Sequence, residues 1–305
     1  MQTIQTLGRT VVVRSIDDQP LAISGKLPRI AKVRDEPFEC IATPGVFVEK
    51  LKHEDLPADI FTFMQEVADT SPRYHFHLEW DSLAVLPITT YDHWWKRQIN
   101  NKTRNMVRKA QKSSLEIRVV EFNDSFVNGI VDIYNESPIR QGRAFWHFGK
   151  NFEAIKRENI TFLDRSDFIG AFYKGELVGF AKLVRGRNVA SLMQIISKIS
   201  HRDKAPSDAL IAQSVEMCAA ERIPYLHYGS WSRGGLGAFK MSHAFVRHEV
   251  PRYFVPLNLR GRLSLKMKLH RKWSDCVPEL WLDRLIRLRN EWNTRRCSAK
   301  TPIGS

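Results

Sequence analysis

The chain has 305 residues, 43% of them hydrophobic, and a formal net charge of +14 at pH 7. This length and composition allow one large or two small domains with a sizeable core, and they exclude a low-complexity chain. No apolar stretch reaches the length of a membrane span, and the first residues lack the charged-then-apolar order of a secretory signal. We therefore expect neither a membrane span nor export, and we predict a cytoplasmic protein.

Two further features of the composition restrict the kind of site. The four cysteines are far apart and form no C-x-x-C, which argues against a zinc cage and a disulfide framework. The positive charge predicts a surface that attracts anions, whether phosphorylated cofactors, nucleic acids or acidic headgroups. It is concentrated in residues 96–118, which hold eight Lys or Arg against the single acid Glu116, and again in residues 260–296.

The first third of the chain predicts a small α/β unit over residues 1–98. Residues 1–40 show no clear period and indicate only short strands or loops. We expect a strand over 45–51, a helix over 55–70 that begins at Asp55 or Asp59, and a pair of strands over 74–80 and 82–88. His75 and His77 share one face of the first of these two strands, but no third metal ligand is apparent and we predict no metal site.

In the middle of the chain the spacing of apolar residues is more regular and predicts secondary structure more clearly. Apolar positions at steps of three and four define a helix with a buried stripe, which consists of Ile99, Thr103, Met106, Val107 and Ala110. Its outer face carries Arg104, Arg108 and Lys112, which is typical of a solvated face and compatible with phosphate contacts. A strand over 117–122, a helix over 125–137 interrupted by Pro138 and a loop over 138–151 follow.

Three strand-like runs over 168–173, 176–184 and 189–197 are separated by turn signals and predict an antiparallel meander. A basic turn over 201–206 leads into a helix over 207–220 and a strand over 225–231. A helix N-terminus has unpaired N–H groups and attracts phosphates. Arg202, Lys204, Ala205 and Ser207 are therefore candidates for binding a phosphorylated donor, although an ordinary capped helix after a basic turn would have the same pattern.

This succession of elements resembles the GNAT acyltransferases, in which an R/Q-x-x-G-x-G/A turn binds the pyrophosphate of acyl-CoA. Arg202, Ala205 and Ser207 take the places of Arg, Gly and Gly/Ala, so both glycines of the pattern are replaced. The chain is also similar to the FemABX-like and cellulose-biosynthesis-type branch over 103–119, 206–231 and 235–257. The last stretch resembles L-x-x-F-K-x-x-x-G-F, with Leu236, Phe239, Lys240 and Phe245 in place and Ala244 instead of Gly.

The resemblance implies an α+β fold with a mixed, largely antiparallel sheet flanked by helices. Residues 99–258 would form the GNAT-like core, 1–98 could be a degenerate GNAT half, and 259–305 would be a basic helical segment. It implies an N- or O-acyltransferase, of the N-acetyltransferase type, that moves an acyl group from acetyl-CoA or another acyl-CoA to an amine or hydroxyl of a small or glycan-linked acceptor. Fem ligases use aminoacyl-tRNA, so this donor is an alternative, and a basic nucleic-acid-binding protein is a third.

By position in the resemblance, residues of two splayed strands lie near the reaction centre: Gln194, Ser197, His227, Tyr228 and Ser230. Strand alternation places His227 and Tyr228 on opposite faces, so only one of them can point into the cleft. His227 is a candidate base and Tyr228 a candidate acid, but a lone strand histidine can equally be structural. Lys240 after a Gly-rich loop could reach a phosphate, or be a solvated helix lysine.

The loop over 138–151 lies where GNAT enzymes bind their acceptor. Its cations and aromatic rings suit a sugar, a nucleotide sugar or an acidic acceptor, and the candidate residues are Arg140, Arg143, Trp146 and His147. A plain loop pinned by Phe145 and Trp146 is the other interpretation.

Overall fold

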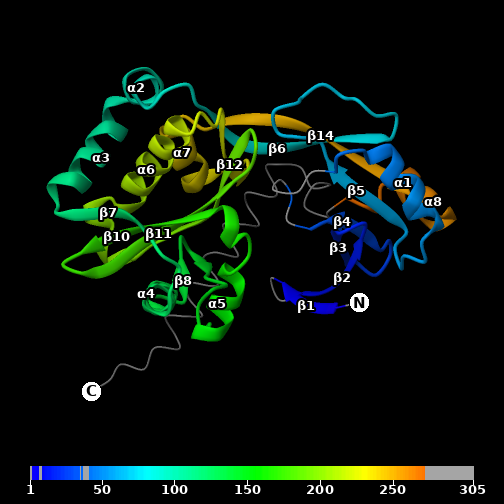
Figure 1. The fold of residues 1–305 in the computed structure, drawn as a ribbon, viewed down its shortest axis with the longest axis horizontal. Helices are drawn as coiled ribbons and strands as arrows, with labels where there is room; N and C mark the ends of the chain where they lie inside the picture. The colour runs from blue at the N-terminus through cyan, green and yellow to red at the C-terminus, as the bar shows by residue number, and fades with distance from the viewer. Residues whose placement is uncertain (1, 7–8, 35, 37–40, 272–305) are drawn as a thin grey trace.

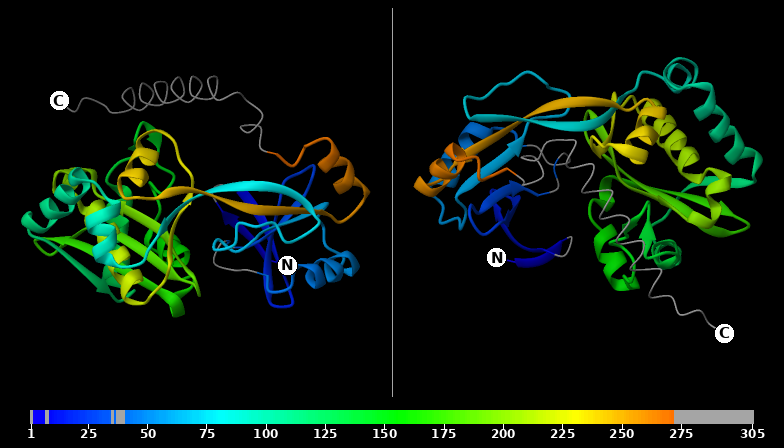
Figure 2. Two further views of the ribbon diagram at one scale, coloured as in Figure 1. Left: turned by 90° about the horizontal axis from the view of Figure 1, so that it is seen from above. Right: turned by 180° about the vertical axis from the view of Figure 1, so that it is seen from behind.

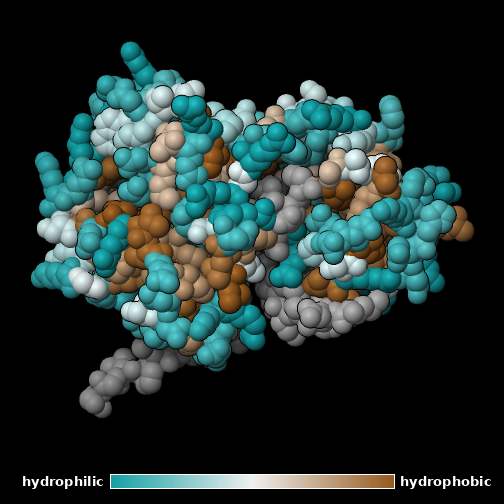
Figure 3. Space-filling view, in the orientation of Figure 1, coloured by the Kyte–Doolittle hydropathy of each residue, from teal (hydrophilic) through white to brown (hydrophobic). Residues whose placement is uncertain are grey.

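The computed structural model describes residues 2–6, 9–34, 36 and 41–271. The described chain forms two lobes joined by two long antiparallel strands, β6 (His77–Pro87) and β14 (Val246–Pro256), which run side by side from one lobe to the other (Figures 1 and 2). The two lobes are also distinct in the space-filling view, in which apolar side chains gather where β10 and β11 run (Figure 3). Strand β6 follows the first lobe in sequence but pairs with β13 of the second, whereas β14 follows the second lobe and pairs with β5 of the first.

One sheet of 12 strands runs through both lobes in the order β1-β2-β3-β4-β5-β14-β6-β13-β12-β11-β10-β7. Neighbours are antiparallel except for the pairs β4–β5 and β12–β13, which are parallel. The remaining strands of this sheet are β1 (Gln2–Thr6), β2 (Arg9–Ile16), β3 (Gln19–Ser24), β4 (Ile30–Val33), β5 (Ile60–Met64), β7 (Leu115–Val120), β10 (Ser166–Tyr173), β11 (Glu176–Arg185), β12 (Val189–Ser197) and β13 (Tyr225–Ser230).

The two halves of the sheet repeat one topology. In the first lobe the meander β2–β3–β4 is followed by helix α1 (Pro44–His53) and by β5, which is parallel to β4. In the second lobe the meander β10–β11–β12 is followed by helix α6 (Pro206–Ala220) and by β13, parallel to β12. Strands β1 and β7 occupy equivalent edges. The first lobe lacks counterparts of α4 (Asp124–Asn135) and α5 (Phe152–Asn159), because β2 begins soon after β1 ends.

Helices cover both faces of the sheet in the second lobe. Helix α6 packs with α3 (Asn101–Lys112) over β10 to β13, around a core that includes Val107, Leu210, Val215 and Leu226. Helices α4 and α5 form a separate core on the other face. The other helical segments are α2 (Tyr91–His93), a π-helical turn (Trp94–Gln98), α7 (Gly234–Ser242), α8 (Leu259–Lys266) and the 3-10 turns Leu163–Arg165 and Ile199–Lys204. A small hairpin of β8 (Ile139–Arg140) and β9 (Arg143–Ala144) interrupts the loop over 138–151.

The α+β fold class is confirmed, as are the predicted elements of the second lobe. The meander is β10–β12, the helix with the stripe of Thr103 and Val107 is α3, and the helices over 125–137 and 207–220 are α4 and α6. These helices had the strongest local signals: Asn100 and Asn123 cap α3 and α4 by accepting hydrogen bonds from backbone N–H groups, a common start of a helix.

Three predictions in the first lobe were wrong. Residues 45–51 form part of helix α1, because Phe47, Val48 and Leu51 bury one helical face. The helix expected over 55–70 contains strand β5, a fully buried run at the centre of the sheet. Asp59 does not open a helix; its carboxylate accepts a hydrogen bond from the backbone N–H of Arg29. The two strands expected over 74–88 are one strand, β6, because the long-range pairing with β14 continues through Asp81 and Ser82.

Among the residues that the structure describes, no helix combines the length and hydropathy needed to cross a bilayer. Of the segment 259–305, residues 259–271 are described and include α8. The rest of this segment, with most of its basic residues, lies outside the described residues.

Candidate functional site

An opening between two parallel strands is the centre of the candidate site. Strands β12 and β13 pair only over Val189–Ser191 and Tyr225–His227 and then separate. Beyond this point β12 stays paired with β11 as far as Ser197, and β13, which is paired with β6 from Tyr225 on, follows β6 past an irregularity to Ser230. The strand ends therefore splay apart beside the start of α6 (Figure 1). The structure brings Gln194 and Ser197 to one side of this opening and Tyr228 and Ser230 to the other.

The turn before α6 keeps a glycine-like backbone without a glycine. Ala205 adopts left-handed torsion angles, φ 55° and ψ 45°, which favour Gly at this position. Ala205 provides no side-chain oxygen to cap the helix, and Pro206 occupies its first position. The first turn of α6 is therefore shaped as in an anion-binding helix start.

The polar side chains of this turn differ in their availability. Arg202 is exposed and forms no ion pair with any residue that the structure describes. Lys204 lies against the ring of Tyr173, 4.7 Å from its centroid, and pairs with Asp203 at 3.0 Å. Ser207 is bonded to Ser197, with 2.8 Å between the two hydroxyl oxygens, which ties the start of α6 to the end of β12. Arg202 is thus the free cation of the turn.

Glu136, at the C-terminal end of α4, and Arg140, in β8, hold the turn in place. Glu136 accepts hydrogen bonds from the backbone N–H groups of Ile199 (2.6 Å) and Ser200 (2.9 Å). Arg140 donates to the carbonyl oxygens of Ser197 (2.6 Å) and Ile133 (2.7 Å), and pairs with Glu136 at 3.2 Å. Although burial raises the pKa of Glu136, the hydrogen bonds from Ser200 and Ile199 outweigh it and the net pKa is lowered. Arg140 is engaged with protein oxygens around the turn.

Part of the predicted acceptor segment packs onto β12. The hydroxyl of buried Tyr134 on α4 donates to the side-chain oxygen of Gln194, and the ring of His147 lies 4.1 Å from that of Tyr134. Burial and the nearby cations Lys150 and Arg140 lower the pKa of His147 to about 3, so its ring is neutral at pH 7. Tyr134 therefore connects His147, predicted to bind the acyl acceptor, with Gln194, predicted to bind the acyl donor.

The remaining acceptor candidates are exposed. The Trp146 side chain lies under the ammonium group of Lys150, 3.5 Å from the ring centroid, and Lys150 pairs with Glu158 at 2.7 Å. Arg143 lies at the exposed tip of the β8–β9 hairpin. Arg143 is thus free to meet a ligand at the surface, and Trp146 offers the part of its half-exposed ring that Lys150 and His147 leave uncovered. His147 and Arg140 instead pack against α4 and the end of β12.

His227 and Tyr228 point to opposite faces of the sheet. Tyr228 packs in the core under α6, against Phe245, whereas His227 contacts Ser191 through Nδ1 at 3.1 Å on the other face. Burial, followed by the charge of Lys240, lowers the pKa of His227 to about 4. Its Nε2 is buried and has no hydrogen-bond partner in the described chain. The ring is neutral at pH 7 and keeps one nitrogen unpaired, as an acceptor of a proton or hydrogen bond would require.

Lys240 is buried and holds the end of β13. Its ammonium group donates to the carbonyl oxygen of Ser230 (2.8 Å) and to Oγ of Ser232 (3.0 Å), and lies 4.6 Å from the Tyr228 ring centroid. The Cβ of any residue other than Gly at position 237 would lie 2.2 Å from the carbonyl oxygen of Ser232, which explains Gly237. Burial lowers the pKa of Lys240 to about 8 and raises that of Tyr228, so Tyr228 keeps its proton at neutral pH.

Two residues of the site were missed in the sequence. Glu136 and Tyr134 lie on α4 near its C-terminus, and both face β12. The spacing of Glu136 and Arg140, four residues apart around Pro138, was the available signal for an ion pair. Nothing local indicates that Tyr134 meets Gln194, because 60 residues separate them.

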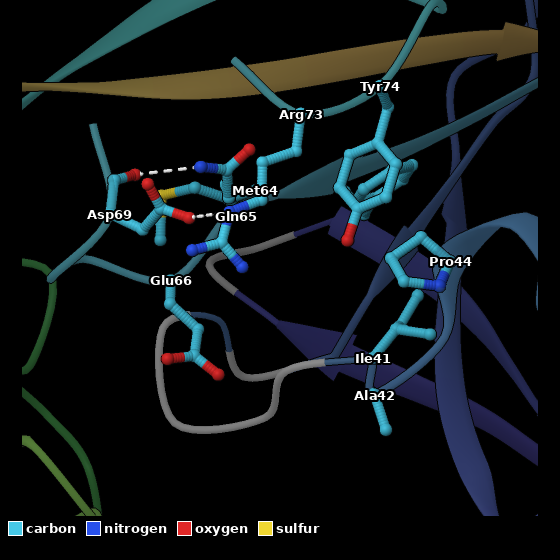
Figure 4. A pocket seen from close by; sticks show the side chains of 10 residues that line it. Ile41, Ala42, Pro44, Met64, Gln65, Glu66, Asp69, Arg73 and Tyr74 are labelled. Atoms are coloured by element: carbon cyan, nitrogen blue, oxygen red, sulfur yellow. Dashed lines mark hydrogen bonds and ion pairs between the residues drawn. The ribbon is translucent and has the colours of Figure 1, made fainter. Parts of the chain in front are cut away.

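A hollow of about 120 Å³ lies in the first lobe, lined by the end of β5 and by residues just before and at the start of α1 (Figure 4). Its polar wall comprises Gln65, Glu66, Asp69, Arg73 and Tyr74. This position corresponds in topology to the opening between β12 and β13 at the start of α6. None of the residues predicted from the sequence lines it.

No family model and no curated protein matches this sequence. Solved structures do match in fold. The C-terminal domain of a putative lysylphosphatidylglycerol synthetase from Agrobacterium fabrum is 14% identical with a TM-score of 0.55, and covers 84% of this chain and 86% of its own. L-PGS from Bacillus licheniformis is 14% identical (TM-score 0.51; 86% and 90% covered), and FemX is 11% identical (TM-score 0.55; 84% and 90% covered).

These likenesses extend over both lobes of the chain, since each covers more than four fifths of it. Together with the meander, the parallel pair β12–β13 and the intervening α6, they show that the chain has a GNAT-like fold of the kind found in FemX and in these synthetase domains.

Proposed function

We propose that the chain is an N- or O-acyltransferase of the FemABX-like or cellulose-biosynthesis-type branch. It would move an acyl group, in the first instance acetyl from acetyl-CoA, to an amine or hydroxyl of a small or glycan-linked acceptor. The observation that supports this most is the separation of β12 and β13 directly beside the uncapped start of α6. An activated acyl group bound there would have its phosphates at the helix start and its carbonyl between the strands.

The residues around the opening suit the parts of an acyl transfer. Arg202 is free to contact a phosphate, and Ser197 and Ser207 form the adjoining wall. The acceptor's lone pair attacks the carbonyl carbon, the bond to the leaving sulfur or oxygen breaks, and the acceptor's proton passes to a base. His227, whose Nε2 is unpaired, is a candidate base, and Tyr228, which burial keeps protonated, is a candidate acid for the leaving group. They are alternatives, because the two side chains point to opposite faces of the sheet and only one of them can face the opening.

The acceptor would enter from the side of α4 and the β8–β9 hairpin. Exposed Trp146 and Arg143 provide a ring face and a positive charge there, which suit a sugar or an anionic group. Gln194 of β12 accepts a hydrogen bond from Tyr134 of α4 and would line the path of the acceptor there.

Aminoacyl-tRNA is a second candidate donor, and two observations favour it. The likeness to FemX and to structures named for lysylphosphatidylglycerol synthesis extends over both lobes. Helix α3 also exposes Lys102, Arg108, Lys109 and Lys112, a surface to which tRNA phosphates could bind. Arg104 of the same helix donates to the carbonyl oxygens of Trp95 and Ile99 and does not belong to this surface.

Thermal unfolding of the full chain with acetyl-CoA, CoA, aminoacyl-tRNA or duplex DNA separates these donors. Acyl-CoA use predicts stabilisation by acetyl-CoA and CoA alike, because the phosphates carry much of the binding. Stabilisation by aminoacyl-tRNA alone would overturn the CoA donor and support the Fem-like reaction. Binding of duplex DNA with a steep salt dependence, and of neither donor, would overturn the enzyme proposal.

A further inference from the structure

A cluster of two histidines and a carboxylate lies in the first lobe, remote from the opening beside α6. His77 and Glu79 lie at the start of β6, two residues apart and so on the same face of the strand, and His270 follows α8. Nε2 of His270 lies 2.9 Å from Oε1 of Glu79, and Nε2 of His77 lies 3.6 Å from the same oxygen. One ligand atom from each of the three lies within 4.8 Å of the other two. This end of β6 and α8 lies at the far side of the first lobe from α6 (Figure 1).

These separations are close to those of a metal site. A tetrahedral metal bound at about 2.0–2.2 Å holds neighbouring ligand atoms about 3.3–3.6 Å apart. Two of the contacts already match this separation within a few tenths of an ångström, and rotations of the exposed His77 side chain can adjust the third. Rotation of the His77 side chain is therefore the adjustment that we expect the cluster to need to accept an ion.

One ligand of the cluster is buried and another is open to solvent. The His270 side chain is fully buried, and its ring packs on Phe254 with centroids 4.7 Å apart. His77 is 42% exposed, so an ion can enter from solvent and keep a water ligand. Nδ1 of His270 is buried without a hydrogen-bond partner among the described residues. The nitrogen of His270 that faces the cluster is Nε2, so this unpaired Nδ1 is not the atom that would bind the ion.

The donor set restricts the ion. Two imidazoles and one carboxylate suit zinc, cobalt, iron or nickel, and they suit magnesium and calcium poorly because these ions prefer oxygen ligands. Arg271 donates to the same oxygen of Glu79 at 2.8 Å and thus competes with a cation for this carboxylate. Its competition predicts moderate affinity that rises when Arg271 is removed.

We propose that His77, Glu79 and His270 bind a divalent transition metal of the zinc class, and that this ion fastens the chain after α8 to strand β6. No metal site was expected from the sequence, because its third ligand lies 193 residues beyond His77. The site is independent of the proposed acyl transfer, because none of its ligands lines the opening beside α6.

The test uses the full chain after treatment with a chelator. Zinc titration by calorimetry and cobalt titration by visible absorption should each report one ion per chain, and zinc should raise the unfolding temperature. His77→Ala should weaken binding by at least about tenfold, as loss of a metal contact does. The matched control is His75→Ala, which removes an exposed histidine two residues away and should leave affinity unchanged. His77 is exposed, so its replacement leaves the fold intact.

Arg271→Ala separates a metal site from an ion-pair network. The proposal predicts tighter zinc binding in this variant, because Glu79 loses its competing cation. Absence of binding to the wild-type chain, equal affinity in His77→Ala, or a cobalt spectrum unchanged by that substitution would each overturn the proposal. A tightening in Arg271→Ala that disappears in the double variant with His77→Ala would support it.

Discussion

Arg140 donates a hydrogen bond of 2.6 Å to the carbonyl oxygen of Ser197, and so joins the segment expected to bind the acceptor to the strand expected to bind the donor. The same guanidinium group pairs with Glu136, which holds the N–H groups of Ile199 and Ser200. A single side chain thus fixes the end of α4, the end of β12 and the turn before α6 relative to one another.

Arg140→Ala should lower the free energy of unfolding by about 2–3 kcal/mol, because it removes the cation paired with Glu136 and the hydrogen bonds to the carbonyl oxygens of Ser197 and Ile133. Denaturant unfolding measures this loss. Arg143→Ala, at the exposed tip of the same hairpin, is the control and should stay within about 0.5 kcal/mol of the wild type. Equal losses in the two variants would show that Arg140 does not hold the turn.

Ala205→Gly should leave the protein as stable or stabilise it by up to about 1 kcal/mol, because the left-handed conformation strains an L-residue but not glycine. The control is Ala219→Gly in the last turn of α6, a right-handed position where Gly should be destabilising, by at most about 1 kcal/mol. Thermal unfolding of both variants measures the difference. If Ala205→Gly destabilises as much as Ala219→Gly, the turn does not have the glycine-like backbone described.

Arg202→Ala should weaken donor binding by about tenfold, the loss expected for one charge-assisted contact to a phosphate, with no change in unfolding. Arg202 is exposed and unpaired among the described residues, so stability does not depend on it. Arg187→Ala, exposed in the β11–β12 turn at the other end of β12, is the matched control for the loss of one positive charge. Unchanged donor affinity in Arg202→Ala would remove this residue from the proposed site.

The lowered pKa of Lys240 predicts that the free energy of unfolding rises with pH in the alkaline range. Burial lowers its pKa to about 8 in the folded chain, whereas in the unfolded chain it titrates near its ordinary value of 10.5. Between these values the unfolded state binds more protons, so the free energy of unfolding increases with pH by at most about 1.4 kcal/mol per pH unit from this group. Lys240→Met should remove that slope, as measured by denaturant unfolding from pH 7 to 10.

The alkaline slope needs a control in which another lysine is removed. Lys204→Met is suitable, because that lysine is paired with Asp203 at the surface and should leave the slope in place. A slope that persists in Lys240→Met, or vanishes in both variants, would contradict a depressed pKa at Lys240.

Glu136 gives a slope of the same sign, stability rising with pH, but in the acid range. Its pKa is lowered in the folded chain, so its contribution to stability is complete above its unfolded pKa of about 4.3 and is lost as the pH falls through the lower folded value. Glu136→Gln should therefore reduce stability at pH 7 by about 1–3 kcal/mol and make the remaining stability less sensitive to acid. Acid titration of unfolding in both proteins checks this, and parallel curves would contradict it.

The sequence by itself determined most of the second lobe, because its elements have local causes. The stripe of Thr103 and Val107 with the cap Asn100 specifies α3, and turn residues between alternating apolar runs specify the meander β10–β12. The positions of Arg202 and Ser207 beside the end of β12 followed from this order. The order of the elements was therefore predictable from local patterns, whereas the fold class and the place of the opening followed from the resemblance that this order and its motifs carry.

Only the tertiary structure decided the first lobe and the contacts within the site. The run Ile60–Met64 could be read as part of a helix until its place between β4 and β14 was known, and β6 is a single strand because β14 pairs with it continuously from His77 to Val85. The contacts of Gln194 with Tyr134 and of Glu79 with His270 join residues far apart in the chain. Such contacts leave no local pattern, because packing of distant elements, and not the propensity of neighbouring residues, brings the side chains together.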